Sequence, residues 1–207
     1  DRDDATARLG VWMFERMLTV GHLPHSMLLV QYRMHPAWCV FPSEQFYEGR
    51  LRSATGLMAQ RSLPSSSSFP WVSSAVPYVV LHSKTPEVRG LRGTFSNDGE
   101  VTAVISSLVL LLRDGLSPEQ VKVITPYDGQ RVLLSRRLSA IPKLAKVSVS
   151  SIDAVQGQEF DIVVLSLVRS NSQRSPGFTC VRCRRHHYYL YYLRQLSGLL
   201  FVLVQLQ

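Results

Sequence analysis

Apolar residues between positions 147 and 168 form two short runs separated by a polar turn that contains glycine. The second run, Ile162 to Val168, is almost continuously apolar, which is typical of a strand covered on both faces in a parallel sheet. The turn, Asp153 to Asp161, carries more carboxylate and amide side chains than a connection needs, and Gly157 lets backbone approach a ligand closely. A plain connection between core strands explains the apolar runs but not this turn. Because ligands bind beyond the carboxyl ends of strands in open α/β sheets, we interpret the turn as half of a binding site.

The rest of the chain alternates helix and strand patterns. Apolar residues at helical spacing predict a helix at 9–19 and a second one that carries Val101 to Leu112 and ends at Gly115. A basic helix is expected at about 129–138, and short β-rich runs predict further strands at 27–30, 77–82 and 121–124. Residues 41–51 indicate an irregular helix and turn, and the Ser/Pro-rich stretch 60–70 indicates a mobile surface loop. Alternating elements with short connections predict an α/β fold with a parallel, doubly wound sheet.

Three polar segments follow predicted strands, and together they carry a family resemblance. They are Gln-Tyr-Arg-Met-His-Pro at 31–36, Thr-Pro-Tyr-Asp-Gly-Gln at 125–130 and Asp-Ala-Val-Gln-Gly-Gln-Glu at 153–159. Their order and spacing resemble the second, C-terminal RecA-like domain of superfamily 1 helicases, most closely the nonsense-mediated mRNA decay branch typified by the regulator of nonsense transcripts. The resemblance runs from Met13 to Phe178 and implies a RecA-like, P-loop NTPase-type parallel sheet flanked by helices.

The resemblance implies one wall of an ATP site. Tyr32 is expected to border or stack on the adenine, and Arg33 is expected to reach the γ-phosphate as the catalytic residue. In the turn, Glu159 is expected to meet the ribose. Its neighbours Gln156, Gly157 and Gln158 are expected to couple the nucleotide to the nucleic-acid channel. The chemistry agrees, since a planar guanidinium stabilises charge on a transferring phosphoryl group and a carboxylate suits ribose hydroxyls.

The resemblance also implies contacts with a single-stranded nucleic acid, RNA being favoured over DNA. Four residues lie in the segments expected to touch its backbone: Thr125, Pro126, Ser151 and Asp153. Hydroxyl and backbone N–H groups hold phosphates without reading sequence, which suits a motor.

Simpler structural roles compete with some of these assignments. Tyr32 as a core aromatic and Arg33 as an ion-pair partner are the alternatives at the first segment. We expect His35, beside a proline, to be structural. Asn97 and Glu100 form the Asn-x-x-Glu pattern of a capping box, and we interpret them as a helix cap.

The chain lacks the Gly-x-x-x-x-Gly-Lys-Ser/Thr pattern of a phosphate-cradling loop, and no Gly-Lys pair occurs. The P-loop and the magnesium site are therefore expected on an upstream RecA-like domain of a longer protein. The 207 residues alone are expected to bind ATP weakly and not to hydrolyse it. We predict no resident metal in this chain.

Composition adds a weak indication of a nucleic-acid partner. The formal net charge is +8, but half of the excess comes from residues 179–207, which hold four Arg and no acid. Three Cys offer no disulfide framework, so we expect an intracellular protein, cytoplasmic with the nucleus as the alternative. We predict no membrane partner, since 188–204 is interrupted by Arg194 and is shorter than the roughly 20 apolar residues of a span.

We divide the chain into a helicase domain at 1–178 and a divergent tail at 179–207 that departs from the family pattern. The tail resembles a frame shift, an unspliced intron or an alternative exon, and we expect it to pack poorly. Its closely spaced Cys180, Cys183, His186 and His187 leave too little chain to wrap a tetrahedral zinc ion. The leading hypothesis is the C-terminal motor domain of an ATP-dependent RNA helicase. The alternatives are a catalytically silent interaction module with the same fold and a DNA motor of the same branch.

Overall fold

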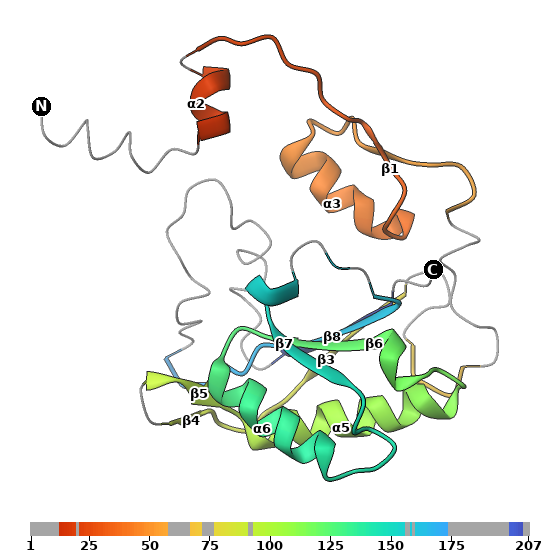
Figure 1. Cartoon of the computed structure of the whole chain (residues 1–207), viewed down its shortest axis with the longest axis vertical. Coiled ribbons are helices and arrows are strands. Elements are labelled where there is room, and N and C mark those ends of the chain that lie inside the picture. The colour runs from red at the N-terminus through yellow and green to blue at the C-terminus, as the bar shows by residue number, and fades with distance from the viewer. Residues whose placement is uncertain are drawn as a thin grey trace, which may run out of the picture.

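A five-stranded sheet forms the centre of the computed structural model, which describes residues 13–19, 21–57, 67–71, 77–90, 93–155, 158, 160–173 and 199–204. The strand order is β3-β9-β8-β6-β7 (Figure 1). The bounds are β3 Tyr78–His82, β9 Leu199–Val204, β8 Ile162–Ser166, β6 Val121–Thr125 and β7 Ser148–Ser151.

β6 pairs in parallel with both β7 and β8, so the predicted parallel α/β fold is confirmed. β9 runs antiparallel between β3 and β8, which makes it the exception to the parallel direction. The apolar runs have the burial expected of central strands, since Val121 and Val123 on β6 and Ile162 and Val164 on β8 are buried.

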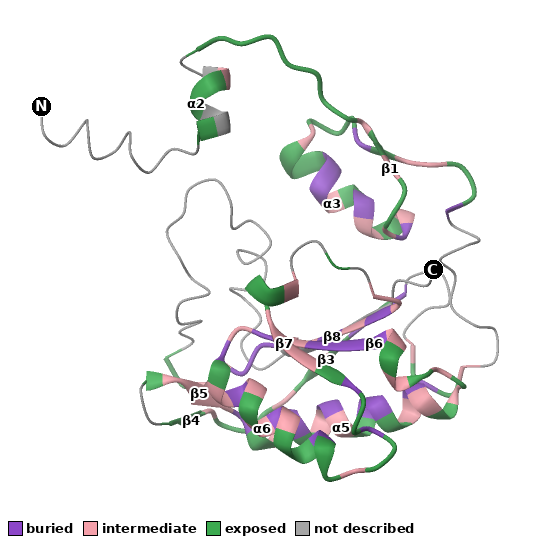
Figure 2. Cartoon of the chain, viewed as in Figure 1, coloured by how far each residue is buried: buried purple, intermediate pink, exposed green. Residues whose placement is uncertain are grey.

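Two helices lie along one face of this sheet, α5 Asp98–Arg113 and α6 Asp128–Ser139 (Figure 1). Both helices were predicted, α5 from its apolar spacing and α6 as a basic helix, and the apolar side chains on their inner faces are buried (Figure 2). The stripes supply much of the core: Val101, Val104, Leu108 and Leu111 from α5, and Leu134 and Leu138 from α6. The 3-10 helix η2, Pro118–Gln120, leads directly into β6.

A smaller unit stands on the other side of the sheet (Figure 1). It contains α3 Pro36–Phe46 and a separate parallel pair, β1 Val30–Gln31 with β2 Arg52–Ser53. The strand predicted at 27–30 is therefore only two residues long and shifted, and the irregular helix predicted at 41–51 is the end of a regular helix with a proline inside. Trp38 on α3 contacts Tyr78 on β3 edge to face, with ring centroids 6.4 Å apart. The short helix α2 Met13–Thr19 falls within the predicted helix at 9–19.

His35 has the structural role expected of it. Its side chain is buried, and Nδ1 accepts a hydrogen bond from the Ala37 amide at 3.1 Å, which caps α3. Burial lowers the pKa of this imidazole, which favours the neutral ring that such an acceptor requires.

The short hairpin of β4 Val88–Arg89 and β5 Phe95–Ser96 was not predicted, because two-residue strands carry no periodicity. Of the stretch 60–70, predicted as a mobile surface loop, only residues 67–70 are described, and they are anchored to the core. The Asp114 carboxylate accepts hydrogen bonds from both hydroxyls of Ser67 and Ser68, and Phe69 is buried in the core. Burial alone would raise the pKa of Asp114, but these bonds lower it to about 2.

The tail differs from its predicted behaviour in one stretch. We expected 179–207 to pack poorly, yet Leu199–Val204 pair with β3 on one side and with β8 on the other. Residues 179–198, with the Cys and His considered for zinc, lie outside the described part, and the domain boundary at 178 stays a prediction.

Candidate functional site

The carboxyl ends of β6 and β7 bring together the residues predicted to contact nucleic acid. Thr125 and Ser151 are direct partners in the parallel register of these strands. Pro126 follows Thr125, and Asp153 begins the 3-10 helix η3, Asp153–Val155, just beyond Ser151. All four predicted residues therefore belong to two adjacent strand exits, although their contact with nucleic acid stays a prediction.

The Thr125 hydroxyl is buried without a partner among the described residues. Thr125 has no exposed surface, and its Oγ1 lacks any hydrogen bond there. Leaving such a group unpaired costs about 1–3 kcal/mol, so proteins rarely retain one without a reason. The hydroxyl is covered in this conformation, so contact with a ligand requires the neighbouring backbone to move.

The turn at 153–161 is only partly described. Gln158 is exposed, and its Nε2 donates to the Ala154 carbonyl at 3.0 Å. This bond folds the side chain back onto η3. Gln156, Gly157 and Glu159 lie outside the described residues, so their predicted roles at the nucleotide stay predictions.

The segment that carries Tyr32 and Arg33 is braced by the side chain of Gln31. Its Oε1 accepts from the amides of Arg33 and Met34 at 2.9 and 2.8 Å, and its Nε2 donates to Met34 O and Ser53 Oγ at 2.8 and 2.6 Å. Tyr32 is 71% exposed, which excludes the core-aromatic alternative. These two residues follow β1 of the separate two-stranded sheet, whereas the β6–β7 exits belong to the five-stranded sheet.

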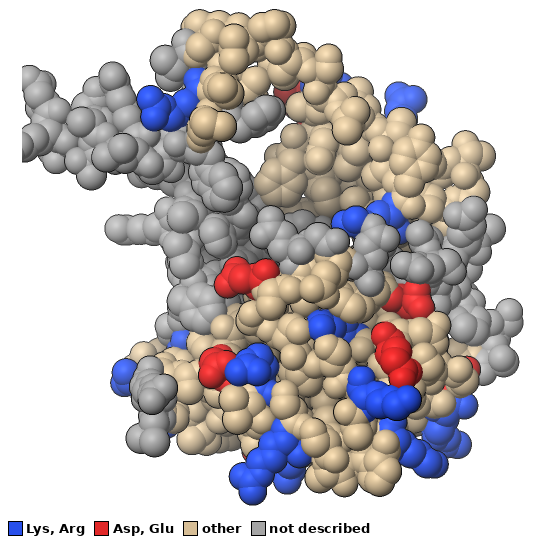
Figure 3. All heavy atoms as spheres, in the orientation of Figure 1, with Lys and Arg blue, Asp and Glu red and all other residues tan. Residues whose placement is uncertain are grey.

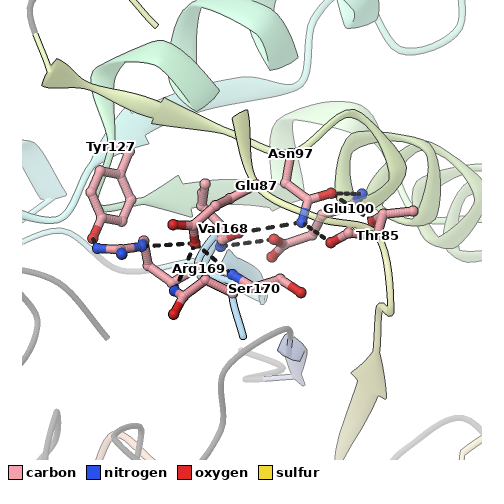
Figure 4. A network of polar contacts seen from close by, with 9 residues as sticks. Thr85, Glu87, Asn97, Glu100, Tyr127, Val168, Arg169 and Ser170 are labelled. Carbon is pink, nitrogen blue, oxygen red and sulfur yellow. Dashed lines mark hydrogen bonds and ion pairs between the residues drawn. The ribbon is translucent and has the colours of Figure 1, made fainter. Parts of the chain in front are cut away.

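A third strand exit, after β8, is held by an acid whose role the sequence did not reveal. Asn97 caps α5 as predicted, since its Oδ1 accepts from the Glu100 amide at 3.0 Å. Glu100 does not complete the capping box, because the Asn97 amide donates instead to Gln130 Oε1 at 2.8 Å. The Glu100 carboxylate accepts from the amides of Leu167 and Val168, each at 2.7 Å (Figure 4).

Glu100 is fully buried, and burial raises its pKa to about 7 against the opposing effect of hydrogen bonds from Val168, Leu167 and Ser166. Each carboxylate oxygen accepts from one backbone amide, which fixes the side chain and favours its ionised form against the effect of burial. No sequence signal separated this role from capping, because the Asn-x-x-Glu spacing is the same for both.

Charge on the view of Figure 3 is mixed. Lys and Arg gather over the half of that face where α5 and α6 lie, with acids among them. Two arginines of α6 are paired: Arg131 with Asp128 at 2.7 Å and Arg137 with Asp98 at 3.4 Å. Exposed pairs of this kind contribute little to stability, and they reduce the charge available to a polyanion.

No group of three or more His, Cys, Asp or Glu side chains among the described residues is placed to hold a metal ion. None of the helices in that part of the chain has the length and apolar character needed to cross a bilayer.

Comparison with known proteins places this arrangement in a family. A family model described as an AAA domain matches residues 9–185. The ATP-dependent helicase NAM7 of Saccharomyces cerevisiae is 40% identical over 86% of this chain, and the ATP-dependent helicase upf1 of Schizosaccharomyces pombe is 36% identical over 84%. A regulator of nonsense transcripts 1 homolog of Drosophila melanogaster is 38% identical over 84%.

The chain spans 19% of the length of each of the two yeast helicases and 15% of the Drosophila protein. The match covers most of this chain, and the parallel sheet flanked by helices is the fold that the resemblance implied. Residues 9–185 therefore belong to the AAA domain family, and over most of its length the chain is similar to proteins named as ATP-dependent helicases and regulators of nonsense transcripts.

Proposed function

We propose that this chain is the C-terminal motor domain of an ATP-dependent RNA helicase. It supplies one wall of the ATP cleft and part of the single-strand channel, and it works with an upstream P-loop domain in a longer cytoplasmic protein. The observation that carries the proposal is the Gln31-braced turn. It presents an exposed aromatic ring beside an arginine, which is the pair of side chains suited to an adenine and a phosphate.

The described residues fit a nucleotide wall better than a complete ATP site. Tyr32 and Arg33 would hold the base and the γ-phosphate, and the hydrogen bonds of Gln31 limit the freedom of their backbone before ligand binds. Magnesium is assigned to the upstream domain, where it would neutralise phosphate charge when bound. This chain contributes orientation and positive charge.

The β6–β7 exits support the nucleic-acid half of the proposal. Thr125 and Ser151 lie side by side in register, so the two strand ends form one continuous edge, on which Ser151 is half-buried and Thr125 is covered in this conformation. Such groups bind phosphates irrespective of base, as a translocating motor requires.

The test is a fusion of this chain to the P-loop domain of the Saccharomyces cerevisiae relative. We expect ATP hydrolysis that a uridine 15-mer stimulates at least tenfold, and no hydrolysis by the 207 residues alone. Stimulation by a thymidine 15-mer but not by RNA would favour the DNA motor. A folded fusion that binds RNA without hydrolysing ATP would favour the silent interaction module.

A further inference from the structure

The segment after β8, Leu167–Asn171, is held by two carboxylates from distant parts of the chain. Glu100 on α5 accepts from the amides of the first two residues, as described above. Glu87 accepts from the Ser170 amide at 2.7 Å, from Arg169 Nε at 2.8 Å and from Asn171 Nδ2 at 3.1 Å (Figure 4). The Glu87 amide in turn donates to the Ser170 carbonyl at 3.1 Å. We call Leu167–Asn171 the exit segment.

The backbone of the exit segment is strained at its centre. Val168 has φ of 73°, in the left-handed region that β-branched residues avoid, and it is fully buried. A conformation of this kind costs on the order of 1–3 kcal/mol and persists only where surrounding contacts impose it. The carboxylates of Glu87 and Glu100 flank Val168 on both sides along the chain, so they supply such contacts.

Arg169, paired with Glu87, connects the exit segment to the turn after β6. The ion pair of Arg169 with Glu87 is nearly buried, and the guanidinium lies 4.2 Å from the centre of the Phe95 ring. Arg169 Nη1 also lies 3.3 Å from the hydroxyl of Tyr127, two residues beyond Thr125. Arg169 is therefore committed to internal contacts.

A second set of hydrogen bonds, through Asn97 and Gln130, connects β8 and its exit segment to α6. Asn97 Nδ2 donates to the Val168 carbonyl at 3.3 Å, and the Asn97 amide donates to Gln130 Oε1. Gln130, fully buried on the first turn of α6, also donates to Ser166 Oγ at 3.0 Å. Two chains of polar contacts thus join the exit of β8 to the exit of β6.

We propose that Glu87 and Glu100 are positioning residues that hold the exit segment against the Thr125–Gln130 turn. They thereby set the geometry of the nucleic-acid edge, by which we mean the adjoining ends of β6 and β7 at Thr125 and Ser151. This inference rests on the proposed function of that edge. Neither acid touches the ligand. Each acts through backbone amides, and Glu87 acts also through Arg169.

The test compares Glu87→Gln and Glu100→Gln in the full 207-residue chain with Glu119→Gln as control. Glu119 makes an exposed pair with Lys146 at the opposite end of β6, so the same Glu→Gln exchange removes a surface carboxylate there without touching the exit segment. Two quantities are measured: hydrogen exchange of residues 167–171 by mass spectrometry, and binding of a fluorescent uridine 15-mer at low salt.

We expect both test variants to exchange at least tenfold faster over 167–171, with unchanged protection of α5, and to bind RNA at least fivefold more weakly. The control is expected to match the unsubstituted chain in both. Exchange within twofold of the unsubstituted chain overturns the inference, as does faster exchange with unchanged RNA binding. If Glu100→Gln fails to fold, Glu87→Gln and Asn171→Ala decide the matter, since each removes bonds to the more superficial acid.

The two proposals fail separately. If the unsubstituted chain does not bind the 15-mer, the proposed nucleic-acid edge is wrong and the positioning inference falls with it. If the chain binds RNA and all variants bind equally well, only the positioning inference is overturned.

Discussion

Thr125 and Ser151 face each other across the parallel pairing of β6 and β7, at the point where both strands end. One lies in the second polar segment of the family resemblance and the other just before the third, and the 25 residues between them comprise α6, a loop and the first part of β7. This pairing places two segments that are separate in the sequence next to each other at the same edge of the sheet. It also makes the role of the Thr125 hydroxyl testable, because that group has no partner among the described residues.

Replacing Thr125 by Val is expected to increase stability by about 1 kcal/mol, because it removes a buried unpaired hydroxyl at nearly constant volume. If the hydroxyl engages phosphate after a local shift, the same variant binds single-stranded RNA several-fold more weakly. Urea unfolding and fluorescence anisotropy measure the two effects. Thr102→Val, on the exposed side of α5, is the control and should leave RNA binding unchanged. A loss of stability at position 125 would contradict the first expectation.

Substitutions at Arg33 and Tyr32 should affect different steps in the fusion with a P-loop domain. Arg33→Ala is expected to lower turnover by roughly a thousandfold while nucleotide affinity stays nearly intact, since an arginine finger acts as charge develops. Tyr32→Ala is expected mainly to weaken nucleotide binding, because stacking serves ground and transition states alike. Lysine at position 33 should not restore turnover, as it lacks the planar fork.

The measurements for these variants are turnover, nucleotide affinity and melting temperature. Arg50→Ala is the matched control, because Arg50 is an exposed arginine of the same unit whose partner is Glu48. An Arg33→Ala protein that melts early and loses binding and turnover together would favour the ion-pair alternative over catalysis.

Glu100 predicts a pH dependence of stability. Its pKa rises by burial from 4.5 to about 7, so between these values the folded protein keeps a proton that the unfolded chain has lost. The contribution to stability is therefore greatest below pH 4.5 and falls as the pH rises to 7, by on the order of 3 kcal/mol at about 1.4 kcal/mol per unit. Urea unfolding from pH 4.5 to 8 should show a flatter profile for Glu100→Gln. Parallel profiles for the two proteins would contradict the assignment.

The positive φ of Val168 predicts that glycine at this position gives a more stable protein than alanine, the reverse of the order expected within a helix. In the left-handed region glycine is unstrained, whereas alanine is not, so Val168→Gly should be about 1 kcal/mol more stable than Val168→Ala. At Val104, a buried residue in the middle of α5, alanine should exceed glycine by about the same amount. Thermal unfolding of the four variants provides the measurement. The usual order at both positions would show that the exit segment relaxes once the valine is removed.

Local patterns predicted the elements that periodicity can encode. Apolar spacing located α5, a basic segment indicated α6, continuous apolar runs located β6 and β8, and the polar residues at strand ends marked the Thr125 and Asp153 segments. These predictions succeeded because each depends on residues within a few positions of one another, and burial on one face leaves a regular trace in the chain. The braced turn at Tyr32 and Arg33 was likewise marked by its residues, although its strand proved shorter than expected.

Contacts between distant segments were decided only by the tertiary structure. Glu100 carries the spacing of a helix cap, but its carboxylate turns to amides 67 and 68 positions away, and Glu87 reaches a segment more than 80 positions away. The strand β9 illustrates the same limit. Its residues follow a stretch without family pattern, yet backbone pairing with β3 and β8 depends on unpaired edges that the sequence does not display. The hydrogen-bond partner of a polar group in one segment depends on which distant segment folding brings next to it. Residue order alone therefore does not identify that partner.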